Sequence, residues 1–210
     1  TYKGKSPGYC GDIACLSFNP SKILSGYGDG GAVITKSAAF AEKVSMMRMY
    51  GTRFEDISVR HPIIGIASRL NPFQAAVLSI KIENLNCKIE HWRINYFLYA
   101  KLLTGVGDLI LPEILDERDF YINGYRFVVL TKKRDQLIKF LKEHKIDARN
   151  HYGTPLPFFG AFSYLGYKKG DFPASEKIAD ESLVLPTDSR LGEKEIKHAA
   201  LLVKQFFETN

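Results

Sequence analysis

The chain has 210 residues, of which 45% are hydrophobic and 25% charged, a composition typical of a folded globular protein and not of a disordered one. No apolar run approaches the roughly 18 residues needed to cross a bilayer, and no signal-peptide core follows the polar start, so we expect a cytoplasmic protein without a membrane span. The 29 Lys and Arg exceed the 23 Asp and Glu by six, but they are spread along the chain, which argues against a nucleic-acid-binding stripe.

The three cysteines exclude two further classes of protein. Cys10, Cys15 and Cys87 are odd in number and lack Cys-x-x-Cys spacing. This pattern argues against both a disulfide framework and a zinc site. We expect reduced thiols that lie partly in the core.

The first part of the chain predicts two short buried strands, over residues 12–18 and 31–35, because both segments are apolar and bounded by polar or glycine-rich sequence. Ser37 is placed to cap a helix that reaches about Tyr50. Residues 51–65 combine Gly, Pro and mixed charge without periodicity, which predicts a loop.

A long helix is predicted over residues 72–103, with Pro72 tolerated in its first turn. At ~1.5 Å per residue it would span ~45 Å, which is longer than a small domain is wide. We therefore place a domain boundary at its end, between residues 1–104 and 105–210. The helical spacing is carried by Phe73, Val77, Ile80, Leu85, Ile89, Trp92, Tyr96 and Leu103.

The second part of the chain alternates strand and helix patterns, which predicts an α/β lobe. A strand is expected over residues 125–131, a helix over 135–144 and a short segment over 146–149. Further helices are expected from Pro173 and over residues 193–207.

A glycine-rich stretch between the first two strands satisfies the G-x-G-x-x-G pattern at residues 26–31. A dinucleotide-binding loop must open a helix, so that a phosphate can lie at the helix N-terminus. Here the stretch leads into Ala-Val-Ile-Thr, a strand pattern. We interpret it as a tight turn whose glycines supply positive φ, and reject a nucleotide site.

Lys22 follows the first predicted strand in a setting that suits a reactive amine. Pro20 rigidifies the approach to it, and the downstream glycines leave room for a bulky group. Ser17 offers a hydroxyl that could bind a phosphate oxygen. A lysine that forms a Schiff base needs such a rigid setting near an anion site.

Several motifs occur in one order along nearly the whole chain. Residues 17–22 read Ser-Phe-Asn-Pro-Ser-Lys, 28–31 read Gly-Asp-Gly-Gly, and 68–76 read Ser-Arg-Leu-Asn-Pro-Phe-Gln-Ala-Ala. Residues 151–156 read His-Tyr-Gly-Thr-Pro-Leu, and 170–173 read Gly-Asp-Phe-Pro. Together they resemble the signature of the DegT/DnrJ/EryC1/StrS family of sugar aminotransferases.

The resemblance implies an α/β fold, the C-terminal part of a pyridoxal-phosphate-dependent transferase of fold type I. Residues 1–104 would be the end of the large cofactor-binding domain, and residues 105–210 the small C-terminal domain. The reaction would move an amino group, usually from glutamate, to a keto group of a nucleotide-linked sugar, in a homodimer.

The same resemblance implies roles for single residues. Lys22 would be the Schiff-base lysine and general acid/base, and Ser17 would bind the cofactor phosphate. His151, Tyr152 and Arg69 would bind substrate, with Arg69 reaching the neighbouring subunit. Ordinary alternatives stay open: a strand-end hydroxyl for Ser17, a surface ion pair for Arg69, and a loop histidine for His151.

The sequence departs from the family pattern in two ways. The acidic partner of the cofactor's pyridine nitrogen belongs to a segment upstream of Thr1, so about half of the enzyme would be supplied by a separate N-terminal chain or be cleaved away. Ala67 stands where many relatives have Asn. Both departures favour the alternative of a non-catalytic scaffold or regulatory subunit, whereas the intact Ser17 and Lys22 favour the enzyme.

Overall fold

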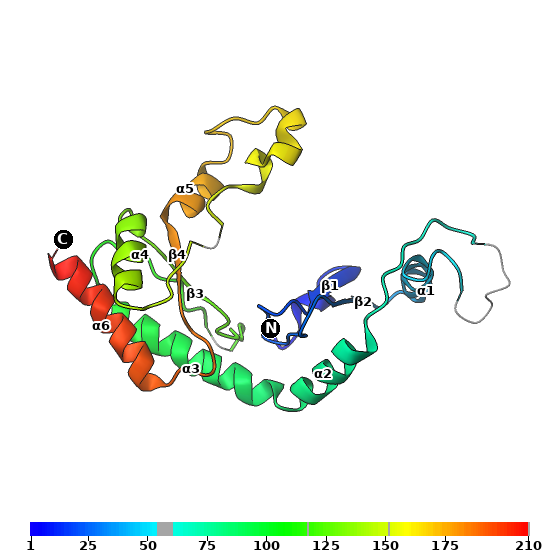
Figure 1. The fold of residues 1–210 in the computed structure, drawn as a ribbon, viewed down its shortest axis with the longest axis horizontal. Helices are drawn as coiled ribbons and strands as arrows, with labels where there is room; N and C mark the ends of the chain where they lie inside the picture. The colour runs from blue at the N-terminus through cyan, green and yellow to red at the C-terminus, as the bar shows by residue number, and fades with distance from the viewer. Residues whose placement is uncertain (54–60, 117, 151, 210) are drawn as a thin grey trace. The chain divides into compact units, whose positions relative to one another are not determined.

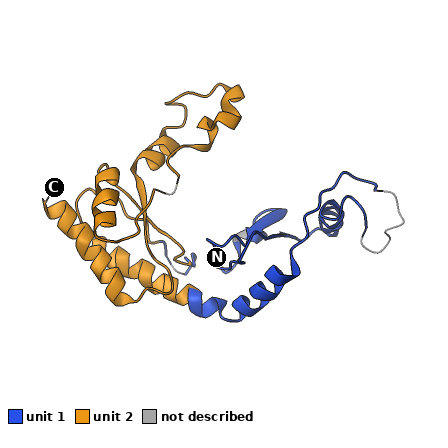
Figure 2. Ribbon diagram, in the orientation of Figure 1, with its two compact units in different colours: residues 1–88, 115–122 blue, residues 89–114, 123–210 orange. Residues whose placement is uncertain are grey.

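The computed structural model describes residues 1–53, 61–116, 118–150 and 152–209. The chain is a mixed α/β protein with two compact units, which are shown in Figure 2 and are described separately below. Unit 1 comprises residues 1–88 and 115–122, and unit 2 comprises residues 89–114 and 123–210. The division into domains at residue 104 stays a prediction.

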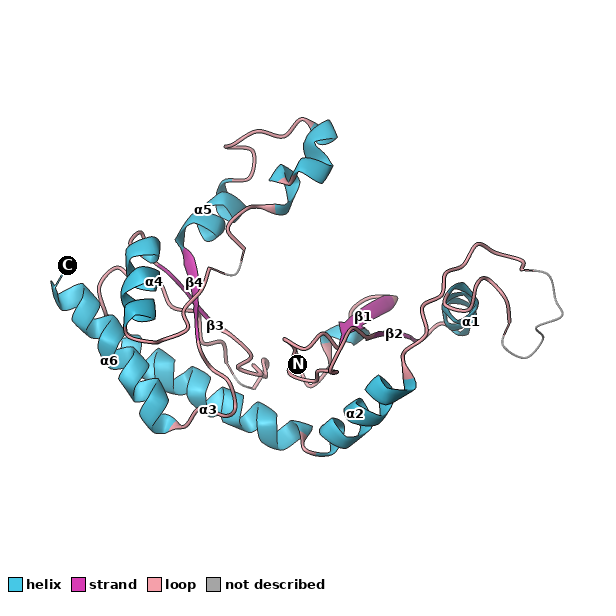
Figure 3. Ribbon diagram, in the orientation of Figure 1, coloured by secondary structure: helices cyan, strands magenta, loops and turns pink. Residues whose placement is uncertain are grey.

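The order of the helices and strands follows the predicted one closely (Figures 1 and 3). Those of the first part of the chain are the 3₁₀ turn Pro7–Tyr9, β1 Ile13–Ser17, β2 Gly31–Thr35, α1 Ala38–Met47 and α2 Pro72–Glu83. Those of the second part are α3 Leu85–Leu103, β3 Phe127–Leu130, α4 Arg134–Glu143, the 3₁₀ turns Leu156–Phe158 and Gly160–Leu165, α5 Pro173–Glu181, β4 Ser182–Leu185 and α6 Glu193–Thr209.

In unit 1, β1 and β2 form an antiparallel pair in which Ile13 lies opposite Thr35 and Ser17 opposite Gly31. The positions of both strands are as predicted, but their burial is not: Ile13 and Leu16 are each 45% exposed. The reason is that the two strands pair only with each other among the described residues. Each of them is therefore an edge strand of a two-stranded sheet, and its side chains are only partly covered.

The N-terminal segment of unit 1 pairs with residues 115–122, which return to it from later in the chain. Tyr2 bridges Phe120, and the amino group of Thr1 donates to the carbonyl of Tyr121 at 2.8 Å.

The helices of unit 1 confirm one prediction and correct another. Ser37 caps α1, its hydroxyl oxygen accepting from the Phe40 amide at 3.3 Å. The prediction of a single helix over residues 72–103 is wrong, because the chain leaves helical geometry at Asn84 (φ −104°, ψ 11°), between α2 and α3. Asparagine is a poor helix former, since its side chain competes for backbone hydrogen bonds. The predicted stripe is also exposed in α2, where Phe73 is 81% exposed.

The predicted loop over residues 51–65 lies partly outside the described residues, and its residues 61–65 belong to no helix or strand.

The main core lies in unit 2. Its β3 and β4 are antiparallel, with Phe127 opposite Leu185, and every residue of β4 is buried. Strand β4 was not predicted from the sequence, although a short apolar run that ends before Pro186 is typical of a buried strand. The predicted strand and helices of this part are confirmed as β3, α4, α5 and α6. In the short segment over residues 146–149, Arg149 bridges Val184 of β4.

Two expectations about the whole chain have different outcomes. Cys10, Cys15 and Cys87 form no disulfide in the described part of the chain, but all three are exposed, so the expected core positions are wrong. Cys15 shares the exposure of its strand β1. Among the described residues, no helix is both long and apolar enough to span a membrane.

Candidate functional site

Lys22 lies in a closed loop that runs from Phe18 to Gly30, named here the lysine loop. Its base is tied by two backbone hydrogen bonds, from the Phe18 amide to the Gly30 carbonyl at 2.8 Å and from the Gly26 amide to the Phe18 carbonyl at 2.7 Å. The Lys22 amide closes a turn by donating to the Asn19 carbonyl at 2.9 Å. The Lys22 side chain is exposed, so the loop presents this amine at the surface of unit 1.

Ser17 is the last residue of β1 and stands on the other side of that turn. Its hydroxyl oxygen accepts from the Asn19 amide at 3.3 Å, and the Asn19 side chain in turn accepts from the Ser21 amide at 3.0 Å. Accepting uses only a lone pair of the Ser17 oxygen, so its O–H can still donate to an anion. Ser17 and Lys22 therefore lie on either side of one tight, hydrogen-bonded turn.

The glycines after Lys22 serve a purpose other than the predicted one. Gly31 begins β2 instead of opening a helix, which confirms that the stretch is no dinucleotide-binding loop. Among the residues described, however, positive φ occurs at seven glycines and none of them lies in this stretch. Gly26 and Gly28 instead allow close approach by Gln74 of α2: a Cβ at Gly26 would lie 2.7 Å from the Gln74 Oε1 atom, and one at Gly28 would lie 3.2 Å from Nε2.

Two residues of α2 that the sequence reading did not single out as site residues contact the lysine loop. Gln74 Oε1 accepts from the Tyr27 amide at 2.6 Å. Lys81 Nζ donates to the Ser25 carbonyl at 2.7 Å and lies 4.2 Å from the centre of the Tyr27 ring. No local signal links residues 47 or more positions apart, so only the quoted Gln-Ala-Ala motif could have drawn attention to Gln74.

Arg69 contacts a different part of unit 1. Its guanidinium lies 5.8 Å from the centre of the Tyr50 ring, and the preceding Ser68 amide donates to the Arg48 carbonyl at 3.1 Å. Leu70, by contrast, approaches the base of the lysine loop, since a Cβ at Gly30 would lie 2.8 Å from Leu70 Cδ1. The substrate-binding role of Arg69 stays a prediction.

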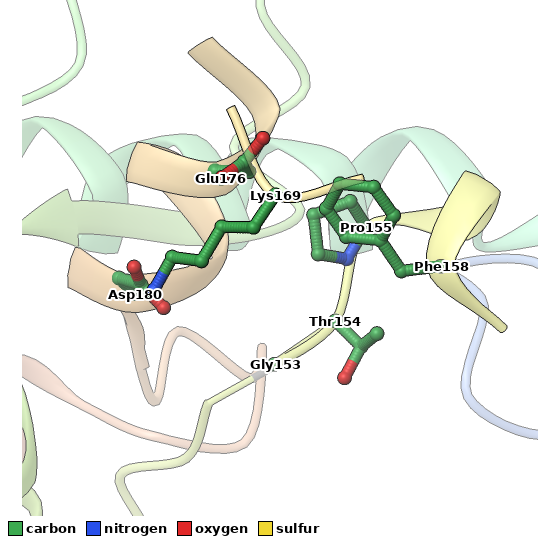
Figure 4. A pocket seen from close by; sticks show the side chains of 7 residues that line it. All are labelled: Gly153, Thr154, Pro155, Phe158, Lys169, Glu176 and Asp180. Atoms are coloured by element: carbon green, nitrogen blue, oxygen red, sulfur yellow. The ribbon is translucent and has the colours of Figure 1, made fainter. Parts of the chain in front are cut away.

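The remaining predicted site residues belong to unit 2. His151 lies outside the described residues, and Tyr152 is 68% exposed. The segment that begins at Gly153 contributes to a pocket of ≈ 210 Å³, shown in Figure 4. The Glu176 carboxylate at its rim accepts from the amides of Gly170 (2.8 and 3.0 Å) and Phe172 (3.1 Å). The pocket is lined by Gly153, Thr154, Pro155, Phe158, Lys169, Glu176 and Asp180.

The fold as a whole is that of a known class of enzymes, the aminotransferases. It matches the crystal structure of S. venezuelae DesV in complex with a ketimine intermediate, with a TM-score of 0.91 and 31% identity over 99% of this chain and 54% of that one. The predicted fold class is thereby confirmed. The chain belongs to the DegT/DnrJ/EryC1/StrS aminotransferase family, whose model matches residues 1–204.

Two curated relatives show how the family varies. The chain is 37% identical to the "Pleiotropic regulatory protein" of Geobacillus stearothermophilus over 98% of its length, which is 55% of that protein. It is 33% identical to the dTDP-3-amino-3,4,6-trideoxy-alpha-D-glucose transaminase of Streptomyces venezuelae over 90% of its length and 49% of that protein. The chain thus spans about half the length of the curated relatives it matches.

Membership of an aminotransferase family implies pyridoxal phosphate as the cofactor. Lys22 of the lysine loop and Ser17 just before the loop fit this group. Lys22 offers an exposed amine, and Ser17 offers a hydroxyl donor at the end of β1, next to a turn whose backbone is already hydrogen-bonded.

Proposed function

We propose that the complete protein is a pyridoxal-phosphate-dependent aminotransferase that moves an amino group from glutamate to a keto group of a nucleotide-linked sugar in the cytoplasm. The observation that carries this proposal is the placement of Ser17 and Lys22 around one turn in a chain of this family. The family relatives that are named as transaminases of nucleotide-linked sugars support the substrate class.

When bound, the cofactor supplies an electron sink for the carbon that gains or loses the amino group. The Lys22 amine holds the cofactor and then takes up and returns a proton at the substrate carbon, because an exposed lysine on a long, flexible side chain can reach both. The Ser17 O–H donates to the cofactor phosphate and thereby fixes the position of the cofactor relative to Lys22.

The substrate side of the site is assigned on the family pattern. His151, Tyr152 and Arg69 bind the sugar nucleotide or the amino donor in this proposal, with Arg69 serving the neighbouring subunit of a homodimer. Because the chain spans about half the length of its relatives, we propose that further residues outside these 210 complete the cofactor site.

A second candidate function is a non-catalytic regulator or scaffold of the same fold. It is favoured by the 37% identity to a relative named as a regulatory protein and by Ala67, which replaces a common Asn of the family motif. This candidate predicts that the fold is kept while covalent attachment of the cofactor is lost.

One experiment separates the two functions. The complete natural protein is incubated with pyridoxal phosphate and reduced with borohydride, and its mass and peptides are then measured. If the protein is an aminotransferase, we expect one phosphopyridoxyl group on Lys22, which should be absent in Lys22→Arg. The control is Lys43→Arg, which changes an exposed lysine of α1 in the same way and should retain the group.

The second arm measures amino transfer from labelled glutamate to a nucleotide-linked keto sugar. Attachment at Lys22 with transfer supports the enzyme. A protein that is folded and binds the nucleotide sugar but shows no attachment at Lys22 is the regulator, and attachment unaffected by Lys22→Arg rejects the role of this lysine.

A further inference from the structure

Helix α2 holds the lysine loop through two side chains that lie on one face. Gln74 and Lys81 are seven residues apart, which is close to two full turns of an α-helix. Gln74 accepts from the Tyr27 amide, and Lys81 donates to the Ser25 carbonyl at 2.7 Å and to the Ser25 hydroxyl at 3.4 Å. Helix α2 therefore holds the part of the lysine loop that follows Lys22, at Ser25 and Tyr27.

The close contact with Gln74 explains why two positions of the loop are glycines. Gly26 is buried, and a side chain there would meet the amide oxygen of Gln74 at 2.7 Å. A side chain at Gly28 would meet the amide nitrogen at 3.2 Å. Real Cβ contacts are almost always longer than these, so the Gly-x-Gly spacing makes room for the Gln74 amide group on either side of Tyr27.

The hydrogen bonds at the loop base complete the restraint. Phe18 ties the loop at Gly26 and Gly30, and Gln74 ties it at Tyr27. The segment between Phe18 and Gly26, which carries Lys22, is thereby closed at both ends. A short closed segment has little conformational freedom, so the position of the Lys22 backbone depends on how firmly its ends are held.

We propose that Gln74 is a positioning residue for Lys22: by holding the Tyr27 amide it keeps the lysine loop in the shape that presents the Lys22 amine to the aldehyde of pyridoxal phosphate. The inference rests on the proposed role of Lys22. Lys81 supports the same loop at Ser25.

The test compares Gln74→Leu, which removes the acceptor at similar size, with Gln74→Glu, which keeps an oxygen that can accept from Tyr27. Gln136→Leu is the matched control, since Gln136 is exposed on α4 of unit 2. All variants are made in the complete natural protein, and global unfolding is recorded for each.

The first readout is hydrogen exchange of the peptide that contains Tyr27, which does not depend on cofactor chemistry. Loss of a typical hydrogen bond should speed exchange of the Tyr27 amide about tenfold in Gln74→Leu. Gln74→Glu should lie within about twofold of the unchanged protein, because it restores an acceptor, and Gln136→Leu should have no effect.

The second readout is the rate of attachment of pyridoxal phosphate to Lys22, quenched with borohydride at timed intervals over a range of cofactor concentrations. A positioning role predicts that the maximal rate falls about tenfold in Gln74→Leu and recovers in Gln74→Glu. The half-saturating concentration should change little, since the phosphate is bound at Ser17.

The outcomes separate the two proposals. An unchanged maximal rate in Gln74→Leu overturns the positioning role, and so does an equal loss in both Gln74 variants that tracks their global stability. Lack of attachment in the unchanged protein overturns the proposed function together with the positioning role, whereas the exchange data still report whether Gln74 holds the loop.

Discussion

Tyr99 of α3 is the side chain whose replacement tests the core of unit 2 most directly. It is fully buried, and its ring stacks on Phe127 with the ring centres 5.3 Å apart. Its hydroxyl oxygen has no hydrogen-bond partner among the described residues. A buried hydroxyl without a partner costs about 1–3 kcal/mol. Tyr99→Phe removes only this oxygen, so we expect the free energy of unfolding to rise by about 1 kcal/mol.

The same replacement should change the response to alkaline pH. Burial raises the pKa of Tyr99 well above its ordinary value of 10.0. Above pH 10 the unfolded chain therefore releases a proton that the folded chain keeps, and stability falls as pH rises, by at most ~1.4 kcal/mol per pH unit for this group. Tyr99→Phe should remove this part of the slope. A shallower dependence should remain, because burial also raises the pKa of Tyr96.

The assay is urea unfolding at several pH values, followed by the fluorescence of Trp92. Trp92 is the only tryptophan of the chain. Its ring stacks on that of Tyr125 in the same unit, with the ring centres 5.0 Å apart. Tyr164→Phe is the control, since Tyr164 is 78% exposed and its replacement should change neither quantity. If Tyr99→Phe lowers the stability by about 1 kcal/mol or more, the hydroxyl has a hydrogen-bond partner and the reasoning is refuted. An unchanged alkaline slope would show that folding does not raise the pKa of Tyr99.

Two further predictions concern unit 2. Gly124 and Gly105 both have positive φ, but an added Cβ would lie 2.6 Å from the Trp92 carbonyl oxygen at Gly124 and has open space at Gly105. In urea unfolding, Gly105→Ala should therefore cost only the ~1–2 kcal/mol of left-handed geometry, and Gly124→Ala at least about 1 kcal/mol more; equal costs would contradict the close approach. Glu176→Ala should speed hydrogen exchange at the Gly170 amide about tenfold, because it removes the only acceptor found for that amide in the described structure, whereas Glu176→Gln should keep most of the protection. Unchanged exchange in Glu176→Ala would show that the amide has another acceptor.

Local signals predicted much of the fold. Ser37 precedes an apolar helical pattern and does cap α1, and Pro173 begins α5 as a residue without an amide hydrogen can. The two strands around the glycine-rich stretch were also placed correctly. The helix starts depend on interactions within a few residues, and the two strands pair across one connecting loop, with Ser17 opposite Gly31.

The errors arose where the outcome depends on distant partners. The apolar pattern of β1 predicts burial, but burial depends on partners distant in sequence, and among the described residues β1 pairs only with β2 and stays largely exposed. A hydrophobic stripe also continues through Asn84, where the helix nonetheless breaks. The contact between Gln74 and Tyr27 joins residues 47 positions apart, and neither the motif around Gln74 nor the glycines alone reveal it.

The distribution of the core decides how the candidate site has to be studied. Among the described residues, the buried hydrophobic side chains of unit 1 are Met46 and Leu78, and the other members of the core lie in unit 2. Trp92 also lies in unit 2, so its fluorescence reports a core that Lys22 does not share. A variant of the lysine loop can therefore leave the unfolding curve unchanged while its loop opens, because local opening requires much less free energy than global unfolding. Measurements on the loop itself, such as exchange at Tyr27 or attachment at Lys22, are for this reason the ones that test the function.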